Sequence, residues 1–280
     1  MCLSCFNTNR EHLYFEYRSI DDKLIVQNDV SLELQVELPE AIMSQKLEIN
    51  PGHDLEALNR SLHKNSRLQV PGFFTEDTAE YLYKLLVENK HWYMAYNEGN
   101  NFYESSMEQL QAVSPQNRQK FMGNIYNRAK TQFQYVFYQY YITQAIELNE
   151  QPGDPLHQMH WFMNEDNTLD FMRKLTGAED IAKADSYATM YLPGHFLTTH
   201  DDRHDKHDRA AAYVISMTKN WDQNWGGHLA FFDDKGNVTD AFIPSFNTLN
   251  IFLIPQAHSV QFISPFAGEN RTSYLGWLHR

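Results

Sequence analysis

The pattern of hydrophobic and polar positions changes near residue 184 of this 280-residue chain. Before that point, apolar residues recur at helical spacing. After Thr75, which can cap a helix, one apolar stripe continues to residue 90 and comprises Ala79, Leu82, Leu85 and Leu86. Beyond residue 184, short runs of apolar and β-branched residues alternate with turn residues, which indicates strands. The predicted strands cover residues 185–192, 196–200, 210–217, 228–232, 247–254, 259–263 and 272–279.

The first part of the chain carries further helix signals. A short helix is predicted near residues 54–63, and another is predicted to end at Gly177, a residue suited to a C-cap. Ser114 and Pro115 begin a third, predicted to run to about Leu148 through a heavily aromatic stretch. This helix either packs on the outside of a sheet or presents an aromatic wall to a substrate groove. Helices followed by many short strands favour an α+β fold, with a double-stranded β-helix (jelly-roll) core braced by N-terminal helices.

The same patterns suggest how the chain is organised. Residues 1–50 are expected to form an N-terminal extension packed on the core, with a strand at residues 29–37. A docking arm for a substrate or partner is the alternative for this extension. Residues 51–280 are expected to form one domain, in which residues 51–184 provide helical support and residues 185–280 provide the jelly-roll core.

One predicted strand ends in residues that could bind a metal ion. The run Tyr191–Thr199 leads into His200-Asp201-Asp202, an H-x-D pair. Because side chains alternate along a strand, His200 and Asp202 are expected on the same side. An imidazole and a carboxylate placed together are two of the three ligands of a facial triad for non-haem Fe(II). A third ligand must come from elsewhere, and His258 follows a buried strand near the end of the chain.

The last motif is Arg271-x-Ser273, thirteen residues after His258. Together with H-x-D, the run W-x(4)-G-G-x-L at residues 221–229 and Tyr191 nine residues before His200, it forms an ordered set. On the basis of these motifs, the chain resembles the Fe(II)/2-oxoglutarate-dependent dioxygenase superfamily, in its prolyl hydroxylase-like branch. The resemblance is good over residues 185–280 and looser over residues 51–184.

The resemblance implies a site and a reaction. Fe(II) would be held by His200, Asp202 and His258, and 2-oxoglutarate by Arg271 with help from Ser273 and Tyr191. The forked guanidinium of Arg271 is suited to a carboxylate, and an arginine buried without an anion would be costly. O2 would be the second substrate, and ascorbate a further cofactor. The expected reaction hydroxylates an unactivated C–H bond and releases succinate and CO2.

The substrate remains open among several hypotheses. The first choice is a prolyl residue of a protein, and the alternative is a free amino acid or another small molecule. A cupin-like metal-binding protein of another activity is a separate possibility, but it would not account for Arg271-x-Ser273. A non-catalytic protein with a decayed site is disfavoured because every expected ligand is intact.

Nearby histidines compete for the metal role, and spacing argues against them. His204 and His207 fall in a charged loop, and His195 stands an odd number of residues from His200 and should face away from the iron. His228 is expected on a strand surface. His157 and His160 lie three apart on a predicted helix without a carboxylate placed by spacing, so they are interpreted as structural or surface residues.

Composition limits the partners. The net charge of −13 argues against binding to nucleic-acid phosphates, which requires a basic surface. The chain shows no apolar run long enough for a membrane span, so no membrane partner is expected. The two cysteines, Cys2 and Cys5, provide no disulfide framework, which fits a reducing compartment and a cytoplasmic location.

Overall fold

The computed structural model describes residues 45–204 and 207–280. The strand predicted at residues 29–37, and most of the extension predicted for residues 1–50, lie outside the described residues. The partition of the chain into an extension, a helical support and a core therefore stays a prediction.

Eight strands in the C-terminal part pair in the manner of a jelly roll. β6 pairs with β13, β7 with β12, β8 with both β11 and β13, and β9 with both β10 and β12, all antiparallel. The first strand therefore meets the last, and the second meets the second-last. The strands are β6 (Tyr187–Tyr191), β7 (Phe196–His200), β8 (Arg209–Ser216), β9 (Leu229–Phe232), β10 (Val238–Phe242), β11 (Thr248–Leu253), β12 (His258–Val260) and β13 (Arg271–His279).

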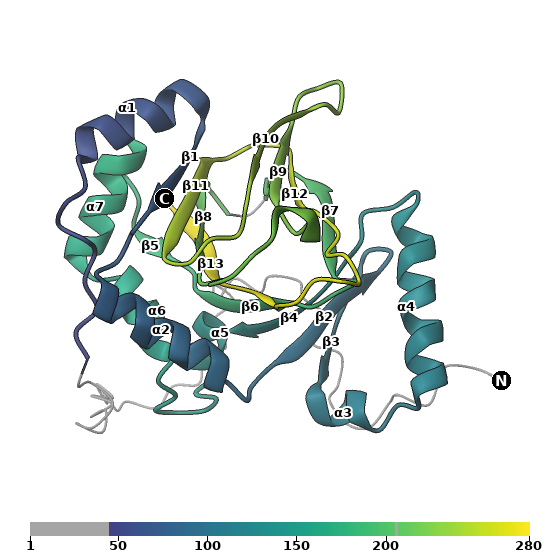
Figure 1. The fold of residues 1–280 in the computed structure, drawn as a ribbon. Coiled ribbons are helices and arrows are strands. Elements are labelled where there is room, and N and C mark those ends of the chain that lie inside the picture. The colour runs from purple at the N-terminus through teal and green to yellow at the C-terminus, as the bar shows by residue number, and fades with distance from the viewer. Residues whose placement is uncertain (1–44, 205–206) are drawn as a thin grey trace, which may run out of the picture.

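The sheet is nearly closed into a barrel (Figure 1). Its strand order among the described residues is β1-β11-β8-β13-β6-β4-β7-β12-β9-β10. Across the gap between the two end strands, Arg67 of β1 donates hydrogen bonds to Asp240 and Thr239 on β10. The additional strands are β1 (Arg67–Pro71), β2 (Tyr93–Glu98), β3 (Asn101–Ser106), β4 (Tyr135–Tyr141) and β5 (Lys183–Ala184). The predicted double-stranded β-helix core is confirmed.

The long helix predicted from Ser114 to Leu148 is wrong. The helix α4 (Pro115–Ala129) is followed by the strand β4 and then by the short helix α5 (Ile142–Glu147). In β4 the side chains alternate between more and less buried positions, which is the period of a strand. Aromatic and β-branched residues favour such a half-buried pleated surface, and this preference outweighs the helical start at Ser114. The hairpin of β2 and β3 extends the sheet beyond β4.

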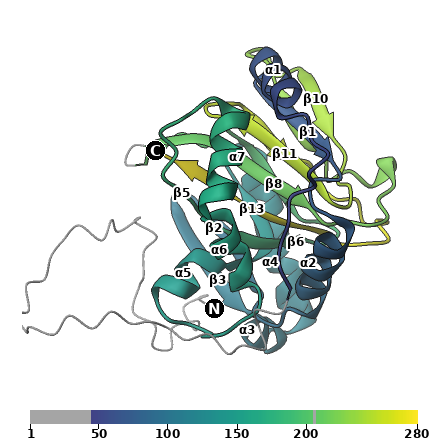
Figure 2. The ribbon, with the colours of Figure 1, turned by 90° about the vertical axis from the view of Figure 1, so that its left-hand side faces the viewer.

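Helices cover the outer face of the sheet formed by β11, β8, β13 and β6 (Figures 1 and 2). The side chain of Asp54 caps the first of them. Gly177, with a φ of 70°, ends the last, as the sequence predicts. The hydroxyl of Tyr274 on β13 donates to the backbone oxygen of Leu82 on α2, at 3.0 Å. The covering helices are α1 (Leu55–Asn65), α2 (Glu76–Glu88), α6 (His157–Met163) and α7 (Asp166–Thr176). The short helix α3 (Met107–Gln111) lies instead beside the hairpin strand β3 (Figure 1).

Alternation along β13 separates the barrel interior from the helix-covered face. Tyr274 and Leu278 pack into the core beneath the helices. Arg271, Ser273 and Trp277 point the opposite way, because residues two apart share a face of a strand. The last strand, β13, therefore places the buried guanidinium of Arg271 inside the barrel.

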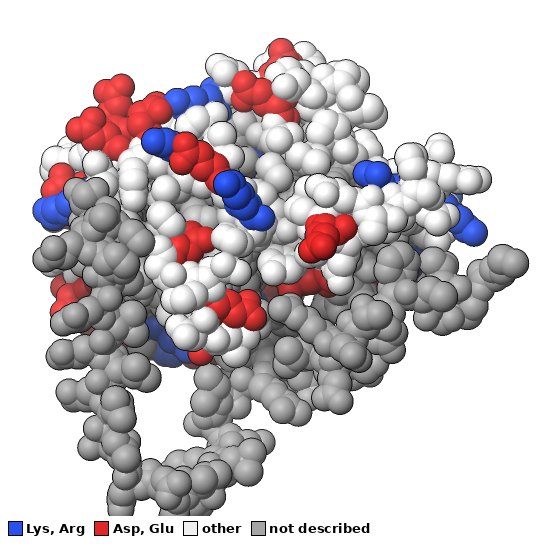
Figure 3. Space-filling model, turned by 90° about the horizontal axis from the view of Figure 1, so that it is seen from below, with Lys and Arg blue, Asp and Glu red and all other residues white. Residues whose placement is uncertain are grey.

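Charge is mixed on the surface seen from below. Acidic side chains lie among a few lysines and arginines on the described part of this face (Figure 3). Among residues 45–204 and 207–280, none of the helices combines the length and the apolar character needed to cross a bilayer.

Candidate metal and cosubstrate site

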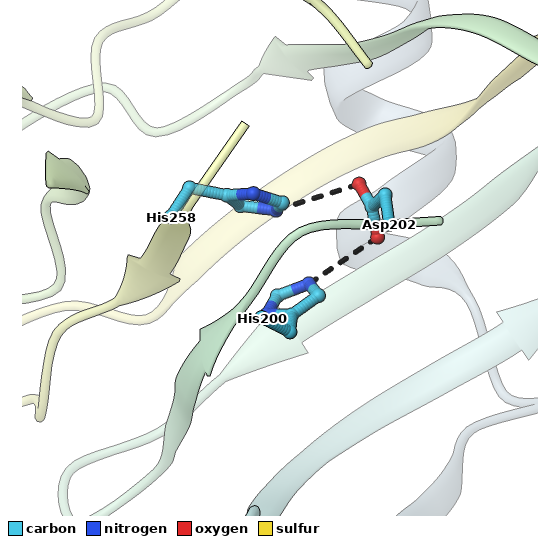
Figure 4. Close-up of side chains that lie close together, drawn as sticks. All are labelled: His200, Asp202 and His258. Atoms are coloured by element: carbon cyan, nitrogen blue, oxygen red, sulfur yellow. Dashed lines mark ion pairs between the residues drawn. The ribbon is translucent and has the colours of Figure 1, made fainter. Parts of the chain in front are cut away.

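Two histidines from neighbouring strands and one aspartate converge inside the barrel (Figure 4). His200 ends β7 and lies directly opposite His258, the first residue of β12. Nε2 of His200 is 3.3 Å from Oδ1 of Asp202, and Nε2 of His258 is 3.4 Å from Oδ2. One ligand atom from each of the three residues lies within 4.8 Å of the others, the only such group of metal-ligating residues in the described parts of the chain.

Asp202 reaches this position by a route that strand alternation does not explain. β7 ends at His200, and Asp202 follows in the left-handed region with a φ of 60°. The expectation that period-two alternation places the two side chains together is therefore right in outcome and wrong in reason. The turn after the strand, not the pleat, directs the carboxylate toward both imidazoles.

The backbone orients both imidazole rings. Nδ1 of His200 lies 3.0 Å from the carbonyl oxygen of Thr198, and Nδ1 of His258 lies 2.8 Å from that of Gln256. Because a carbonyl only accepts, each Nδ1 carries the proton in a neutral ring, and each Nε2 keeps its lone pair toward Asp202. Such outer hydrogen bonds are typical of metal-ligating histidines. The donor set and its orientation fit a divalent cation.

Protonation in the cluster also suits a cation. Burial and the charge of His200 lower the pKa of His258 to about 4. Burial tends to raise the pKa of Asp202, but the hydrogen bond that the protonated ring of His200 donates from Nε2 and the charge of protonated His258 outweigh it and lower the pKa to about 2. Burial tends to lower the pKa of His200, whereas its hydrogen bond and charge interaction with Asp202 raise it. At neutral pH the cluster therefore offers a carboxylate and at least one neutral imidazole.

Arg271 is the most unusual group in the barrel. Its side chain begins β13 and only 3% of the residue is exposed. Its Nε and Nη1 are buried and have no hydrogen-bond partner among the described residues. The guanidinium carbon lies 5.1 Å from the ring centre of Tyr191, the residue opposite it on β6. Burial lowers the pKa of Arg271, and an unpaired buried cation is costly, so the donors are suited to an anion.

The comparison with protein families agrees with this geometry. The sequence model of the 2OG-Fe(II) oxygenase superfamily matches residues 186–279. Residues 186–279 are therefore similar to a 2OG-Fe(II) oxygenase domain. This similarity implies Fe(II), 2-oxoglutarate, O2 and an oxidisable substrate. The resemblance stated from sequence, and the enzyme class of a 2-oxoglutarate-dependent dioxygenase, are confirmed. No curated protein matches the chain.

Solved structures share the fold of the oxygenase domain and much of what precedes it. A prolyl-4-hydroxylase from Pseudomonas putida is 19% identical with a TM-score of 0.52, over 81% of this chain and 98% of that one. A 2OG-Fe(II) oxygenase-family oxidoreductase from Burkholderia pseudomallei is 12% identical with a TM-score of 0.55, over 83% and 93%. A prolyl hydroxylase from Trichoplax adhaerens, solved with a hypoxia inducible factor peptide, is 12% identical with a TM-score of 0.51, over 80% and 88%.

The other two residues expected at the cosubstrate end of the oxygenase domain are fully buried. Tyr191 stacks on Phe137 of β4, with ring centres 4.8 Å apart. The hydroxyl of Ser273 lies 2.9 Å from that of Thr189, so in this structure it is engaged with β6. The structure thus brings Tyr191 to the guanidinium of Arg271, while Ser273 lies two residues farther along the same strand.

The histidines outside the cluster lie elsewhere. His204 and His207 lie close together in the β7–β8 loop, with ring centres 4.5 Å apart. His195 lines a cavity of about 270 Å³ beside α4, away from the metal cluster. His228, expected on a strand surface, is partly buried, and burial and the charge of Arg271 lower its pKa. His157 bonds to Tyr140 at 2.9 Å, as expected of a structural histidine.

Four residues near the cluster were not singled out from sequence as site residues. Phe133, just before β4, lies 5.7 Å from His200 between ring centres, and Phe137 lies against Tyr191. Arg209 donates to the backbone oxygen of Asp202 and stacks on Trp277. No local motif marks these positions, because strands distant in sequence bring them to the site.

Proposed function

We propose that the chain hydroxylates an unactivated C–H bond, with a prolyl residue of a polypeptide as substrate, and releases succinate and CO2. His200, Asp202 and His258 hold Fe(II), and Arg271 with Tyr191 and Ser273 holds 2-oxoglutarate. The observation that carries the proposal is the buried guanidinium of Arg271. It has unpartnered donors inside the same barrel as the only described His-Asp-His cluster.

When bound, the iron supplies the activation of O2 that the decarboxylation of 2-oxoglutarate drives. The chain's own residues set the conditions. Arg271 holds the far carboxylate, because its fork offers two parallel donors and keeps its charge. Tyr191 and Phe137 form an apolar wall beside it that excludes water. The Nδ1 protons stay on the outer side of both histidines, so the Nε2 atoms remain available to the cation.

A row of aromatic rings supports an apolar substrate group. It begins at Phe133, which is 42% exposed and adjacent to His200. From there it passes through Tyr135, 5.8 Å from Phe133, to Phe137, 5.4 Å from Tyr135. The row joins the surface to the cosubstrate end of the barrel. Flat apolar faces suit the pyrrolidine ring of proline, and the Trichoplax adhaerens neighbour was solved with a peptide.

The proposal also includes the cellular location and a reductant. A reducing compartment such as the cytoplasm agrees with only two cysteines in the chain. Ascorbate, as a reductant that restores Fe(II), follows from the family chemistry. A free amino acid or another small molecule is the alternative substrate, and the exposure of Phe133 would serve it as well.

The test compares proline-containing peptides with free proline. Purified protein with Fe(II) and 2-oxoglutarate is followed by succinate release and by mass gain of one oxygen on the substrate. We expect coupled turnover with peptides and none with the His200→Ala and His258→Ala variants. Turnover with free amino acids alone would defeat the polypeptide assignment. Undiminished turnover in either histidine variant would defeat the metal assignment.

The aromatic row has its own test. Phe133→Ala removes the ring nearest His200 and should raise the KM for the peptide about tenfold, the effect of losing roughly 1.4 kcal/mol of apolar contact. The KM for 2-oxoglutarate should stay unchanged. Val87→Ala is the matched control, because Val87 is 62% exposed on α2, on the helix-covered side of the sheet. Equal peptide KM values for both variants would remove Phe133 from the substrate site.

A further inference from the structure

The backbone of Asp202 is held by a side chain from another strand. Nη1 of Arg209, the first residue of β8, donates to the backbone oxygen of Asp202 at 3.2 Å. The guanidinium carbon of Arg209 lies 3.8 Å from the ring centre of Trp277 on β13. Only 8% of Arg209 is exposed. One planar group therefore contacts an aromatic ring on its face and the Asp202 carbonyl at its edge.

The conformation of Asp202 explains why such a contact is needed. A residue with a side chain at a φ of 60° is strained relative to the right-handed region, although aspartate tolerates this conformation better than most residues. The segment would relieve this strain by rotating the Asp202 backbone, which would turn the carboxylate away from His200 and His258. β7 has already ended, so no strand hydrogen bonding fixes the residue. The bond from the charged donor Arg209 opposes the rotation, because a hydrogen bond from a charged group is stronger than one between neutral groups.

We propose that Arg209 is a positioning residue that holds Asp202 in its metal-binding conformation, with Trp277 as the platform that fixes the guanidinium plane. This inference rests on the proposed function, in which Asp202 is a ligand of the iron. Arginine is suited to the task because its plane stacks on the indole while its edge donates. Lysine carries the same charge but lacks both the plane and the fork.

A merely structural role is the competing explanation. Arg209 pairs with His279 where β8 meets β13, so its loss could loosen the barrel without any specific effect on Asp202. The two explanations differ in what they predict for the folded protein. A structural residue changes thermal stability alone, whereas a positioning residue changes the affinity for a metal ion at temperatures where the protein is fully folded.

The experiment measures Mn(II) binding to the full chain by the loss of the free-ion electron paramagnetic resonance signal, together with the Tm. Arg209→Lys should weaken Mn(II) binding about 10- to 100-fold, the range for one lost bond from a charged donor. Arg203→Lys is the matched control. Arg203 lies one residue from Asp202 but is exposed and pairs with Asp201 at 3.2 Å. Its variant should bind Mn(II) within about twofold of the wild type.

Trp277→Leu provides a second route if Arg209→Lys fails to fold. It leaves Arg209 in place without its platform and should weaken Mn(II) binding in the same direction. Trp277→Phe is its control, because it keeps an aromatic face for Arg209 but removes the indole N–H that interacts with the Asp202 carboxylate, and it should bind Mn(II) more tightly than Trp277→Leu. Unchanged affinity in folded Arg209→Lys and Trp277→Leu, with only the Tm lowered, would overturn the positioning role and leave the metal site intact. A wild-type chain that binds no Mn(II) would overturn the proposed function itself, and with it the role of Arg209.

Discussion

Replacing Arg271 with methionine should stabilise the protein without ligand and abolish its response to 2-oxoglutarate. The guanidinium is buried with two unpartnered nitrogens, and its neighbour Tyr191 compensates only in part. Cation–π contact contributes about 0.5–2 kcal/mol, whereas desolvation of an unpaired ion costs several. Hydrophobic replacement of buried charges gains about 1–4 kcal/mol in other proteins, so the Tm of the ligand-free variant should rise.

Binding of 2-oxoglutarate should stabilise the wild type more than the Arg271→Met variant, whereas without ligand the variant should be the more stable of the two. With Mn(II) present and 2-oxoglutarate at 100 times its Kd, the wild type gains about 2.7 kcal/mol from ligand binding. A variant with a 100-fold weaker Kd gains only about 0.4 kcal/mol under the same conditions. At about 2–4 °C for each kcal/mol, the ligand-induced shift in Tm should differ by roughly 5–9 °C.

The assay is differential scanning calorimetry with and without 2-oxoglutarate, using Mn(II) so that no turnover occurs. Arg173→Met is a suitable control, because Arg173 is a partly exposed arginine of α7 that pairs with Asp170 on the outer surface. A variant at Arg271 that loses stability without ligand, yet keeps the full shift with 2-oxoglutarate, would refute the reasoning. The carboxylate would then be held by another group.

The remaining predictions concern stability and the metal. Burial lowers the pKa of His195 to about 4 from an ordinary value of 6.5, so the folded state binds fewer protons than the unfolded state between these values. The free energy of unfolding should therefore fall as the pH drops from 6.5 to 4, by about 3 kcal/mol at most. Urea denaturation at a series of pH values should show a smaller fall for His195→Phe, and an unaltered dependence on pH would contradict the prediction. Gly276→Ala should destabilise the protein by about 1–3 kcal/mol or more, because the new Cβ would collide with the backbone oxygen of Asp185; a denaturation midpoint equal to that of the wild type would contradict it. His204→Ala should leave Mn(II) affinity unchanged, whereas His258→Ala should abolish binding, and equilibrium dialysis separates the two outcomes.

The jelly-roll core could be predicted because its signals are local. Strand β7 was predicted with the bounds that the structure shows, since an apolar run after Gly194 ends in polar residues. The end of α7 was also predicted, because a single glycine determines it. The candidate site could be predicted from the ordered motifs at Asp202, His258 and Arg271. Carboxylate and imidazole groups are suited to a metal ion, and a guanidinium is suited to an anion.

Other features depend on contacts that sequence periodicity does not report. The aromatic run of β4 was mistaken for helix because a dense apolar stretch satisfies both periods. Strand β3 is largely exposed and lacks the apolar alternation that would mark it. The left-handed Asp202 was not predicted, because only a small share of aspartates adopt this conformation and the local sequence does not mark which ones do. Arg209 and Trp277 belong to different strands, and only the folded barrel places them together.

The position of His200 opposite His258 has a consequence for the lifetime of a bound ion. These residues belong to the pairing of β7 with β12, where β12 is only three residues long and the register shifts after His258. Because the pairing of β7 with β12 is short and irregular, it should open locally more easily than the long pairing of β8 with β13. An ion held across it would slow amide exchange at Val260 while leaving exchange in β8 unchanged. The rate at which the ion dissociates would then be set by the local opening of the β7–β12 pairing rather than by the exchange of individual ligands.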